Sequence, residues 1–279
     1  MIFHISRPVN WNGYLAWCMV ALCVEKKKGI EMSYQTKSYA WNIYAVRMPL
    51  LFLLSVLTAA GGAAERSPQA NPGEGELTAH FRRMSTYHGR MDGSVPEGAV
   101  LFIGDSITQG LCVAAICEHG VNYGIGSDTT AGVLERLPLY TSTARAAAVV
   151  LAIGVNDLQR RDNEYILENL REILERVTKD VPVVISSILP LDERAAAGSA
   201  GRNERIAKLN EEIAALCILF PTCVYVNAFP LLLDDTKNLS VFYHVGDGVH
   251  PNTAGYEKWI DALRNGIETV TKSEKVQKR

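Results

Sequence analysis

The sequence has little net charge, few aromatic residues and no internal repeat. Over 279 residues the formal charge is -2, and aromatic residues make up 8%. A nucleic-acid-binding domain would carry a basic patch or stripe, so the near-neutral balance argues against a nucleic-acid partner. No segment recurs with a period of about 20 to 50 residues, which excludes a solenoid. With 48% hydrophobic residues, the chain can form one sizeable core.

The sequence also lacks the short motifs of several enzyme classes. There is no HExxH, no paired histidine spacing and no CxxC, so nothing predicts a metal site. The patterns GxGxxG and GxxxxGK[ST] are absent, which argues against a nucleotide-binding domain. GxSxG is absent as well, so the chain does not carry the nucleophile elbow of an α/β-hydrolase. We therefore expect neither a metal nor an organic cofactor.

Cysteine usage leaves the redox state open. Two of the six cysteines, Cys18 and Cys23, precede the expected leader cleavage. An exported chain could pair some of the others. The spacing does not reveal whether these four residues are buried thiols or include a disulfide: Cys112, Cys117, Cys217 and Cys223.

The first quarter of the chain resembles an export leader. An apolar run at 14–24 is too short to span a bilayer as a helix, which needs about 20 residues. A second apolar run, 49–57, follows Lys37 and Arg47 and leads into small residues up to Ala64. A basic flank, an apolar middle and small residues before a cut form the pattern of a signal peptide.

We predict three regions from this pattern. They are an upstream extension with a signal peptide at 1–64, a linker rich in Pro, Gly and polar residues at 65–76, and a folded domain at 77–279. The extension is most simply explained by a true translation start at Met32 or Met48. We expect cleavage and export to the periplasm or the medium, with no stable membrane insertion afterwards. An uncleaved membrane anchor is the alternative.

From residue 98 onward, strand and helix patterns alternate. Apolar runs typical of strands buried on both faces lie at 99–103, 147–153, 181–185 and 223–226, with a weaker one at 120–123. Apolar residues at helical spacing occupy 166–177, 206–216 and 254–270. The alternation predicts a three-layer α/β/α domain with a parallel sheet and right-handed crossovers.

Reactive residue types follow several of these strands, at the edge where open α/β sheets bind ligands. GDSIT begins at Gly104, GIGSDT at Gly124 and GVND at Gly154, and DGVHP begins at Asp247 after a longer connection. Each segment alone is weak evidence, because Gly, Asp, Ser and Asn are common turn residues. Their convergence on one edge of the sheet predicts an active site.

The segments supply the groups that acyl transfer needs. The hydroxyl of Ser106 requires a base, and the imidazole of His250, oriented by Asp247 three residues earlier, suits that task. The oxyanion that forms requires hydrogen-bond donors. The candidate donors, backbone N–H groups and one side-chain amide, are Ser106, Gly126 or Ser127, and Asn156.

GDSIT, NYGIGSDTT, IGVND and DGVHPN resemble, in this order, the four blocks of the GDSL or SGNH hydrolase family, over residues 98–267. The resemblance implies a flavodoxin-like sheet of five parallel strands. It implies Ser106 as the nucleophile, Asn156 as an oxyanion donor, and Asp247 with His250 as the rest of a triad. It lies nearest to the branch with platelet-activating-factor acetylhydrolase-like and carbohydrate acetylesterase-like members.

The second block departs from the family pattern. The family usually places glycine at the oxyanion position, and alignment puts Ser127 there, with Gly126 one step earlier. Because the donor is a backbone N–H, serine can serve if its dihedral angles are allowed. The choice between these two residues stays open.

Other polar residues near the four blocks are interpreted as structural. Asp128 and Thr129 are expected to cap the helix that follows them. Asp157 is expected to orient a loop through hydrogen bonds, and Asp105 is expected to be structural too. His244 is interpreted as a loop residue near the triad, with a place in the lining of the substrate pocket as the alternative.

We predict hydrolysis of short-chain carboxylic esters, such as acetyl esters, through an acyl-enzyme. The substrate would be a small-molecule or carbohydrate ester, since no long apolar tract suggests a deep acyl tunnel. One alternative is a lysophospholipase or thioesterase acting on longer chains. Another is a non-catalytic carbohydrate-binding module on the same fold. The oligomeric state is left open, as is the choice between a lid and a solvated loop for 192–202.

Overall fold

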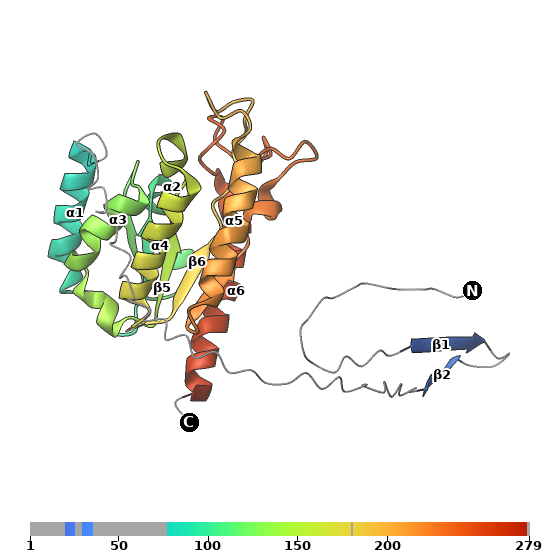
Figure 1. Ribbon diagram of the computed structural model, residues 1–279. Coiled ribbons are helices and arrows are strands. Elements are labelled where there is room, and N and C mark those ends of the chain that lie inside the picture. The colour runs from blue at the N-terminus through green and yellow to red at the C-terminus, as the bar shows by residue number, and fades with distance from the viewer. Residues whose placement is uncertain (1–19, 26–29, 36–76, 180, 278–279) are drawn as a thin grey trace, which may run out of the picture. The chain divides into compact units, whose positions relative to one another are not determined.

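The structure is a computed structural model that describes residues 20–25, 30–35, 77–179 and 181–277 (Figure 1). The chain divides into two compact units, Met1–Glu65 and Arg66–Arg279. In the first unit, β1 (Val20–Glu25) pairs antiparallel with β2 (Ile30–Gln35), a pair that the sequence patterns did not predict. The predicted signal peptide run, cleavage site and linker lie outside the described residues.

The second unit is built on a five-stranded parallel sheet. Its strands are β3 (Val100–Gly104), β4 (Gly120–Gly124), β5 (Ala148–Ala152), β6 (Val183–Ser186) and β7 (Cys223–Val226). The spatial order β4-β3-β5-β6-β7 confirms the predicted flavodoxin-like α/β fold. Gly104 is in register with Gly124 and with Ala152, so three strands end at the same level.

Six helices accompany the sheet in the described part of this unit. They are α1 (Ala79–Asp92), α2 (Ser106–Gln109), α3 (Thr130–Arg136), α4 (Asn163–Val177), α5 (Arg202–Ile218) and α6 (Thr253–Gln277). Helices α3, α4 and α5 lie side by side, and α6 packs along β5, β6 and β7 (Figure 1). Thr129 is the N-cap of α3, as expected, because its hydroxyl accepts the N–H of Gly132.

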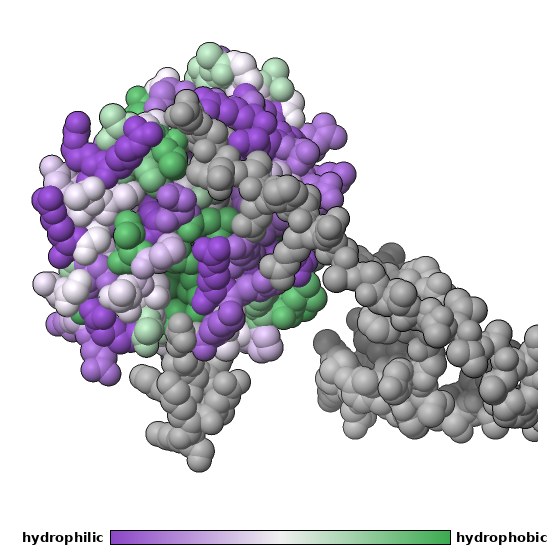
Figure 2. Space-filling view, turned by 60° about the vertical axis from the view of Figure 1, so that its left-hand side comes forward, coloured by the Kyte–Doolittle hydropathy of each residue, from purple (hydrophilic) through white to green (hydrophobic). Residues whose placement is uncertain are grey.

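The core lies between the sheet and these helices. The side chains of the inner strands β3, β5 and β6 are almost fully buried, as their continuous apolar runs predicted, and Leu101 and Phe102 are both 0% exposed. The edge strands β4 and β7 are partly exposed. The largest buried side chain is Trp259 of α6, whose indole N–H donates to the Ser186 hydroxyl at 3.0 Å. The surface in Figure 2 mixes hydrophilic and hydrophobic residues. Among the helices that the structure describes, none has the length and apolar character needed to cross a bilayer.

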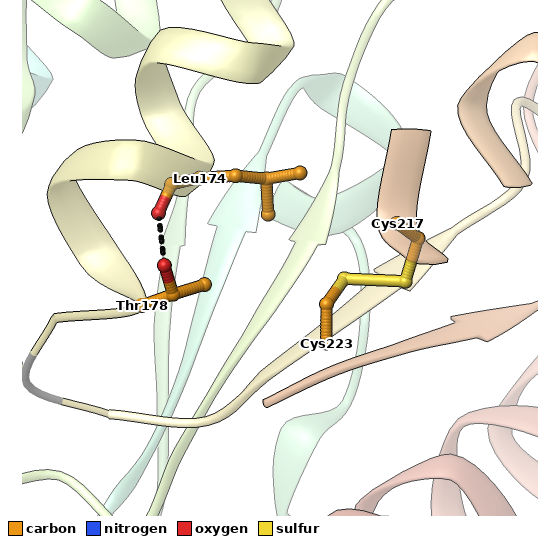
Figure 3. Close-up of a disulfide and its surroundings, with 4 residues drawn as sticks. All are labelled: Leu174, Thr178, Cys217 and Cys223. Atoms are coloured by element: carbon orange, nitrogen blue, oxygen red, sulfur yellow. Dashed lines mark hydrogen bonds between the residues drawn. A yellow bond between two sulfur atoms is a disulfide. The ribbon is translucent and has the colours of Figure 1, made fainter. Parts of the chain in front are cut away.

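A disulfide ties the end of α5 to the start of β7. Cys217 and Cys223 are bonded, with a Cα–Cα distance of 5.6 Å, next to the end of α4 at Leu174 and Thr178 (Figure 3). Cys112 and Cys117 are free thiols. The question that the sequence left open is thus answered by one disulfide and two thiols among these four cysteines.

Candidate active site

The predicted nucleophile lies at the junction between β3 and α2. The strand ends at Gly104, and Ser106 is the first residue of the helix. Asp105 caps the helix, since its Oδ1 accepts the N–H of Ile107 at 2.9 Å. A Cβ atom at Gly104 would lie 2.2 Å from the side-chain oxygen of Thr108 in α2 and 2.2 Å from the carbonyl oxygen of Ala152 in β5, so glycine lets the helix begin this close to the sheet. The junction therefore holds the serine at the carboxyl edge of the sheet.

The predicted base lies within hydrogen-bonding distance of that serine. The Oγ atom of Ser106 is 2.8 Å from Nε2 of His250, although 144 residues separate them in the chain. Nδ1 of His250 is 2.6 Å from Oδ2 of Asp247. The Oδ1 atom of Asp247 accepts the backbone N–H groups of Val249 and His250, both at 2.9 Å. The three side chains thus form a continuous chain of hydrogen bonds from carboxylate to imidazole to hydroxyl.

These bonds decide the charge of the carboxylate. Burial alone would raise the pKa of Asp247, but hydrogen bonds from the His250 ring and from two backbone N–H groups outweigh burial and lower this pKa to about 2. Asp247 is therefore ionised across the neutral range. An ionised partner favours the proton on Nδ1 of His250 and leaves Nε2 free to accept the serine proton.

The turn after β4 contributes the candidate backbone donors. The N–H of Gly126 already donates to Oε1 of Gln109 at 2.6 Å. No bond from the N–H of Ser127 occurs among the described residues. Ser127 has φ +64°, in the left-handed region that favours glycine, which explains why the family pattern has glycine there. Of the two open candidates, Ser127 has the uncommitted N–H.

Asn156 lies beside the same turn. Its side-chain Nδ2 donates to the carbonyl oxygen of Asp128 at 2.9 Å. An amide nitrogen has two hydrogens, so one holds the side chain against the turn and the other can bond an oxyanion. The structure therefore brings Asn156 next to the turn of Ser127, and it brings Ser106 to the triad residues.

A buried arginine that sequence reasoning missed connects these segments. Arg136 of α3 is 1% exposed, and its Nε donates to Oδ2 of Asp128 at 2.8 Å. Its two terminal nitrogens donate to the carbonyl oxygens of Tyr123 (2.7 Å) and Gly104 (3.0 Å). Arg136 thus holds together the ends of β3 and β4 and the turn that contacts Asn156.

Two further carboxyls lie buried beneath the site. Burial raises the pKa of Asp105 to about 7, and the charges of Asp128 and Asp157 act in the same direction. Burial likewise raises the pKa of Asp157 to about 6, although the N–H and hydroxyl of Thr130 both donate to it. Asp105 caps α2 and Asp157 holds the start of α3, so both carboxyls are structural, as expected. Asp247 is the carboxylate that contacts the imidazole directly, with Oδ2 at 2.6 Å from Nδ1 of His250.

Cavities near the site differ in size and lining. One of about 20 Å³ is lined by Asp105, Ile107 and Val155 among others, and by none of the three predicted triad residues. Another, of about 880 Å³, lies between the segment after β5 and the start of α5, and none of the predicted catalytic residues lines it. In the part of the chain that the structure describes, no cluster of three or more His, Cys, Asp or Glu side chains is arranged to hold a metal ion.

Comparison with known proteins places the chain in a family. Residues 102–258 match the GDSL-like lipase/acylhydrolase family. This match spans more than half of the sequence, so the chain belongs to that family. Platelet-activating factor acetylhydrolase IB subunit alpha1 of Rattus norvegicus is 27% identical over 195 residues, which cover 66% of this chain and 82% of the rat protein.

Solved structures share the fold. A GDSL-like lipase from Bacteroides thetaiotaomicron has a TM-score of 0.59 at 22% identity, covering 66% of this chain and 97% of that one. Axe2, an acetylxylan esterase from Geobacillus stearothermophilus, has a TM-score of 0.51 at 17% identity, covering 61% and 95%. Family and fold together confirm the predicted carboxylic ester hydrolase.

Proposed function

We propose that the protein cleaves esters through an acyl-enzyme formed on Ser106. The observation that carries the proposal is the bond chain from Asp247 to His250 to Ser106, with lengths of 2.6 and 2.8 Å. Nε2 of His250 takes the serine proton as Oγ attacks the acyl carbon, and Asp247 stabilises the imidazolium. His250 then gives this proton to the leaving alkoxide. Water attacks the acyl-enzyme by the reverse sequence and releases the acid.

The oxyanion of each tetrahedral intermediate would be held by the backbone N–H groups of Ser106 and Ser127 and by the amide of Asn156. Replacing Asn156 by alanine is expected to lower kcat by about 100-fold or more, because one preorganised donor is lost from the transition state. Steady-state hydrolysis of p-nitrophenyl acetate measures this. A kcat within about twofold of wild type would remove Asn156 from the oxyanion site.

We propose that the substrate carries a short acyl group, acetyl above all. The sequence of the folded domain has no long apolar tract that would form a deep acyl tunnel, which favours a small acyl group. The similarity to an acetylhydrolase at 27% identity supports the same choice. The alcohol part would be a small molecule or a carbohydrate.

Hydrolysis of longer acyl chains is a second candidate that one observation favours. Three apolar side chains on the loop that carries the triad residues are exposed: Val241 (57%), Phe242 (77%) and Val245 (64%). Exposed apolar residues beside a reaction site can contact a long acyl chain or a lipid surface. This candidate uses the same three catalytic side chains.

A chain-length series of p-nitrophenyl esters, from acetate to palmitate, distinguishes the two candidates. We expect kcat/KM to be highest for acetate and to fall steeply with each added pair of methylenes. An optimum at long chains, together with loss of that optimum in Phe242→Ser, would favour the second candidate instead. Acetylated xylan and an acetylated glycerolipid would then identify the alcohol part.

We also propose that the protein is exported. The leader pattern before residue 65 supports export, and so does the disulfide between Cys217 and Cys223, since such bonds persist in oxidising compartments. Fractionation of cells that produce the full chain is expected to place a shortened form outside the cytoplasm. An uncleaved chain in the cytoplasmic fraction would contradict export.

A further inference from the structure

The histidine that precedes the triad turn is buried and hydrogen-bonded to that turn. His244 is 7% exposed, and its Nδ1 accepts the backbone N–H groups of Gly246 at 3.0 Å and Gly248 at 3.1 Å. These glycines flank Asp247, and their φ angles are +106° and +75°. Because glycine leaves the backbone free to adopt many conformations, the shape of the turn depends on such bonds.

The other ring nitrogen of His244 faces a buried carboxylate. Nε2 lies 3.3 Å from Oδ2 of Asp192, within ion-pair distance though outside hydrogen-bond geometry. Asp192 is 2% exposed, and its Oδ1 accepts a bond from Nε of Arg194 at 2.7 Å, which lowers the pKa of Asp192. An ionised carboxylate at this place favours a proton on Nε2, and Nδ1 is then an acceptor.

The segment 192–202, left open between a lid and a solvated loop, packs directly against the turn. The N–H of Asp192 donates to the carbonyl oxygen of Gly248 at 2.8 Å. A Cβ atom at Gly248 would lie 2.7 Å from the backbone of Asp192 and Ala196. The carboxylate of Glu193 accepts the N–H of Gly201 at 2.7 Å, which closes the segment on itself. The segment 192–202 therefore packs against the backbone of the turn that carries Asp247 and supports its conformation.

We propose that His244 is a positioning residue for the triad: held against Asp192 in its Nε2-protonated form, it fixes the turn that carries Asp247 and His250. The proposal rests on the proposed function, because His244 acts only through those two residues. It requires opposite tautomers for two histidines of one loop. Nδ1 carries the proton in His250, whose ring bonds Asp247, and Nε2 carries it in His244.

Two variants distinguish the roles of the two ring nitrogens of His244. In His244→Asn, the amide oxygen takes the place of Nδ1 and can still accept the N–H groups of Gly246 and Gly248. In His244→Gln, the amide nitrogen takes the place of Nε2 and can face Asp192, but the acceptor for the turn is lost.

We expect His244→Gln to lower kcat for p-nitrophenyl acetate by about tenfold to a hundredfold with KM nearly unchanged, because the base is displaced from the serine. His244→Asn should stay within about threefold of wild-type kcat, since the turn keeps its acceptor. Equal kcat values for His244→Gln and wild type would overturn the proposal, and so would equal losses in both variants.

The protonated ring nitrogen of His244 can be measured on the wild-type protein, so this test does not depend on the folding of a variant. Long-range ¹H–¹⁵N correlation spectra of the histidine rings report which nitrogen carries the proton. We expect Nδ1 of His244 to be unprotonated at neutral pH and Nδ1 of His250 to be protonated; a protonated Nδ1 of His244 would overturn the positioning role. If instead wild-type protein hydrolyses no ester while His244 has the expected tautomer, the proposed function fails and the turn geometry stands.

Discussion

Replacing Ser106 by alanine is expected to lower kcat/KM for p-nitrophenyl acetate on the order of 10⁴-fold or more. Alanine removes the only atom of this residue that can attack the acyl carbon, and the donors and base that remain cannot replace it. The fold should persist, because the Oγ atom contacts only Nε2 of His250 among the described bonds. The unfolding midpoint of the variant should therefore stay close to that of wild type.

A serine elsewhere provides the matched control. The hydroxyl of Ser85 on α1 is buried and has no hydrogen-bond partner in the described part of the chain. Ser85→Ala removes the same atom type and should keep wild-type turnover. Wild-type turnover in Ser106→Ala, measured on protein whose thermal unfolding shows an intact fold, would rule out Ser106 as the nucleophile.

Replacing Arg136 by methionine is expected to lower the free energy of unfolding by about 3 to 5 kcal/mol, since it leaves a buried charge unpaired. The side chains of Arg136 and Asp128 are 0% and 1% exposed, so water cannot take the place of the lost partner. The carbonyl oxygens of Gly104 and Tyr123 lose donors as well. Urea unfolding followed by circular dichroism measures the change.

Two further variants test the physical cause of this loss. Arg176 pairs with Glu172 at the surface, with a side chain that is 42% exposed, and Arg176→Met should cost no more than about 1 kcal/mol. The double variant Arg136→Met with Asp128→Asn should recover part of the stability, because it removes the stranded charge. A loss of under about 1 kcal/mol in Arg136→Met would contradict the importance of this pair.

The sheet and the four site segments could be predicted because they obey local rules. Strands buried on both faces need continuous apolar runs, and each predicted run contains most of an observed strand, with ends shifted by one or a few residues. Three of the four site segments lie at strand ends, where parallel topology brings them together regardless of their distance in the chain. The fourth segment, which begins at Asp247, follows β7 only after a longer connection, so its place beside Ser106 was predicted from the family resemblance as well.

Helix α1 could not be predicted from periodicity, because its buried face is polar. Its buried residues are Phe81, Ser85, His88 and Asp92, which recur at helical spacing but are mostly polar. Asp92 is held there by tertiary bonds to hydroxyls that lie far along the chain, such as that of Tyr123 at 2.7 Å. No local pattern shows such bonds in advance.

Arg136 and the choice between Gly126 and Ser127 have a similar explanation. Arg136 lies three residues after Val133, and helical spacing places both on the buried face of α3. A charged residue on a buried face was the one signal in the sequence of a buried ion pair. The choice of oxyanion donor depends on the bond from Gly126 to Gln109, which joins the turn after β4 to the end of α2. Such contacts depend on side-chain geometry that only the folded chain defines.

The most direct test of the account is to find the acetyl group during turnover. Wild-type protein is mixed with p-nitrophenyl acetate and quenched in acid after milliseconds. The protein is then digested, and tandem mass spectrometry identifies any acetylated peptide and the residue that carries the acetyl group. The account predicts one acetyl group, on Ser106, that disappears as turnover proceeds to completion. Steady turnover with acetyl on another side chain, or with no acetylated peptide at any quench time while product forms in a burst, would contradict it.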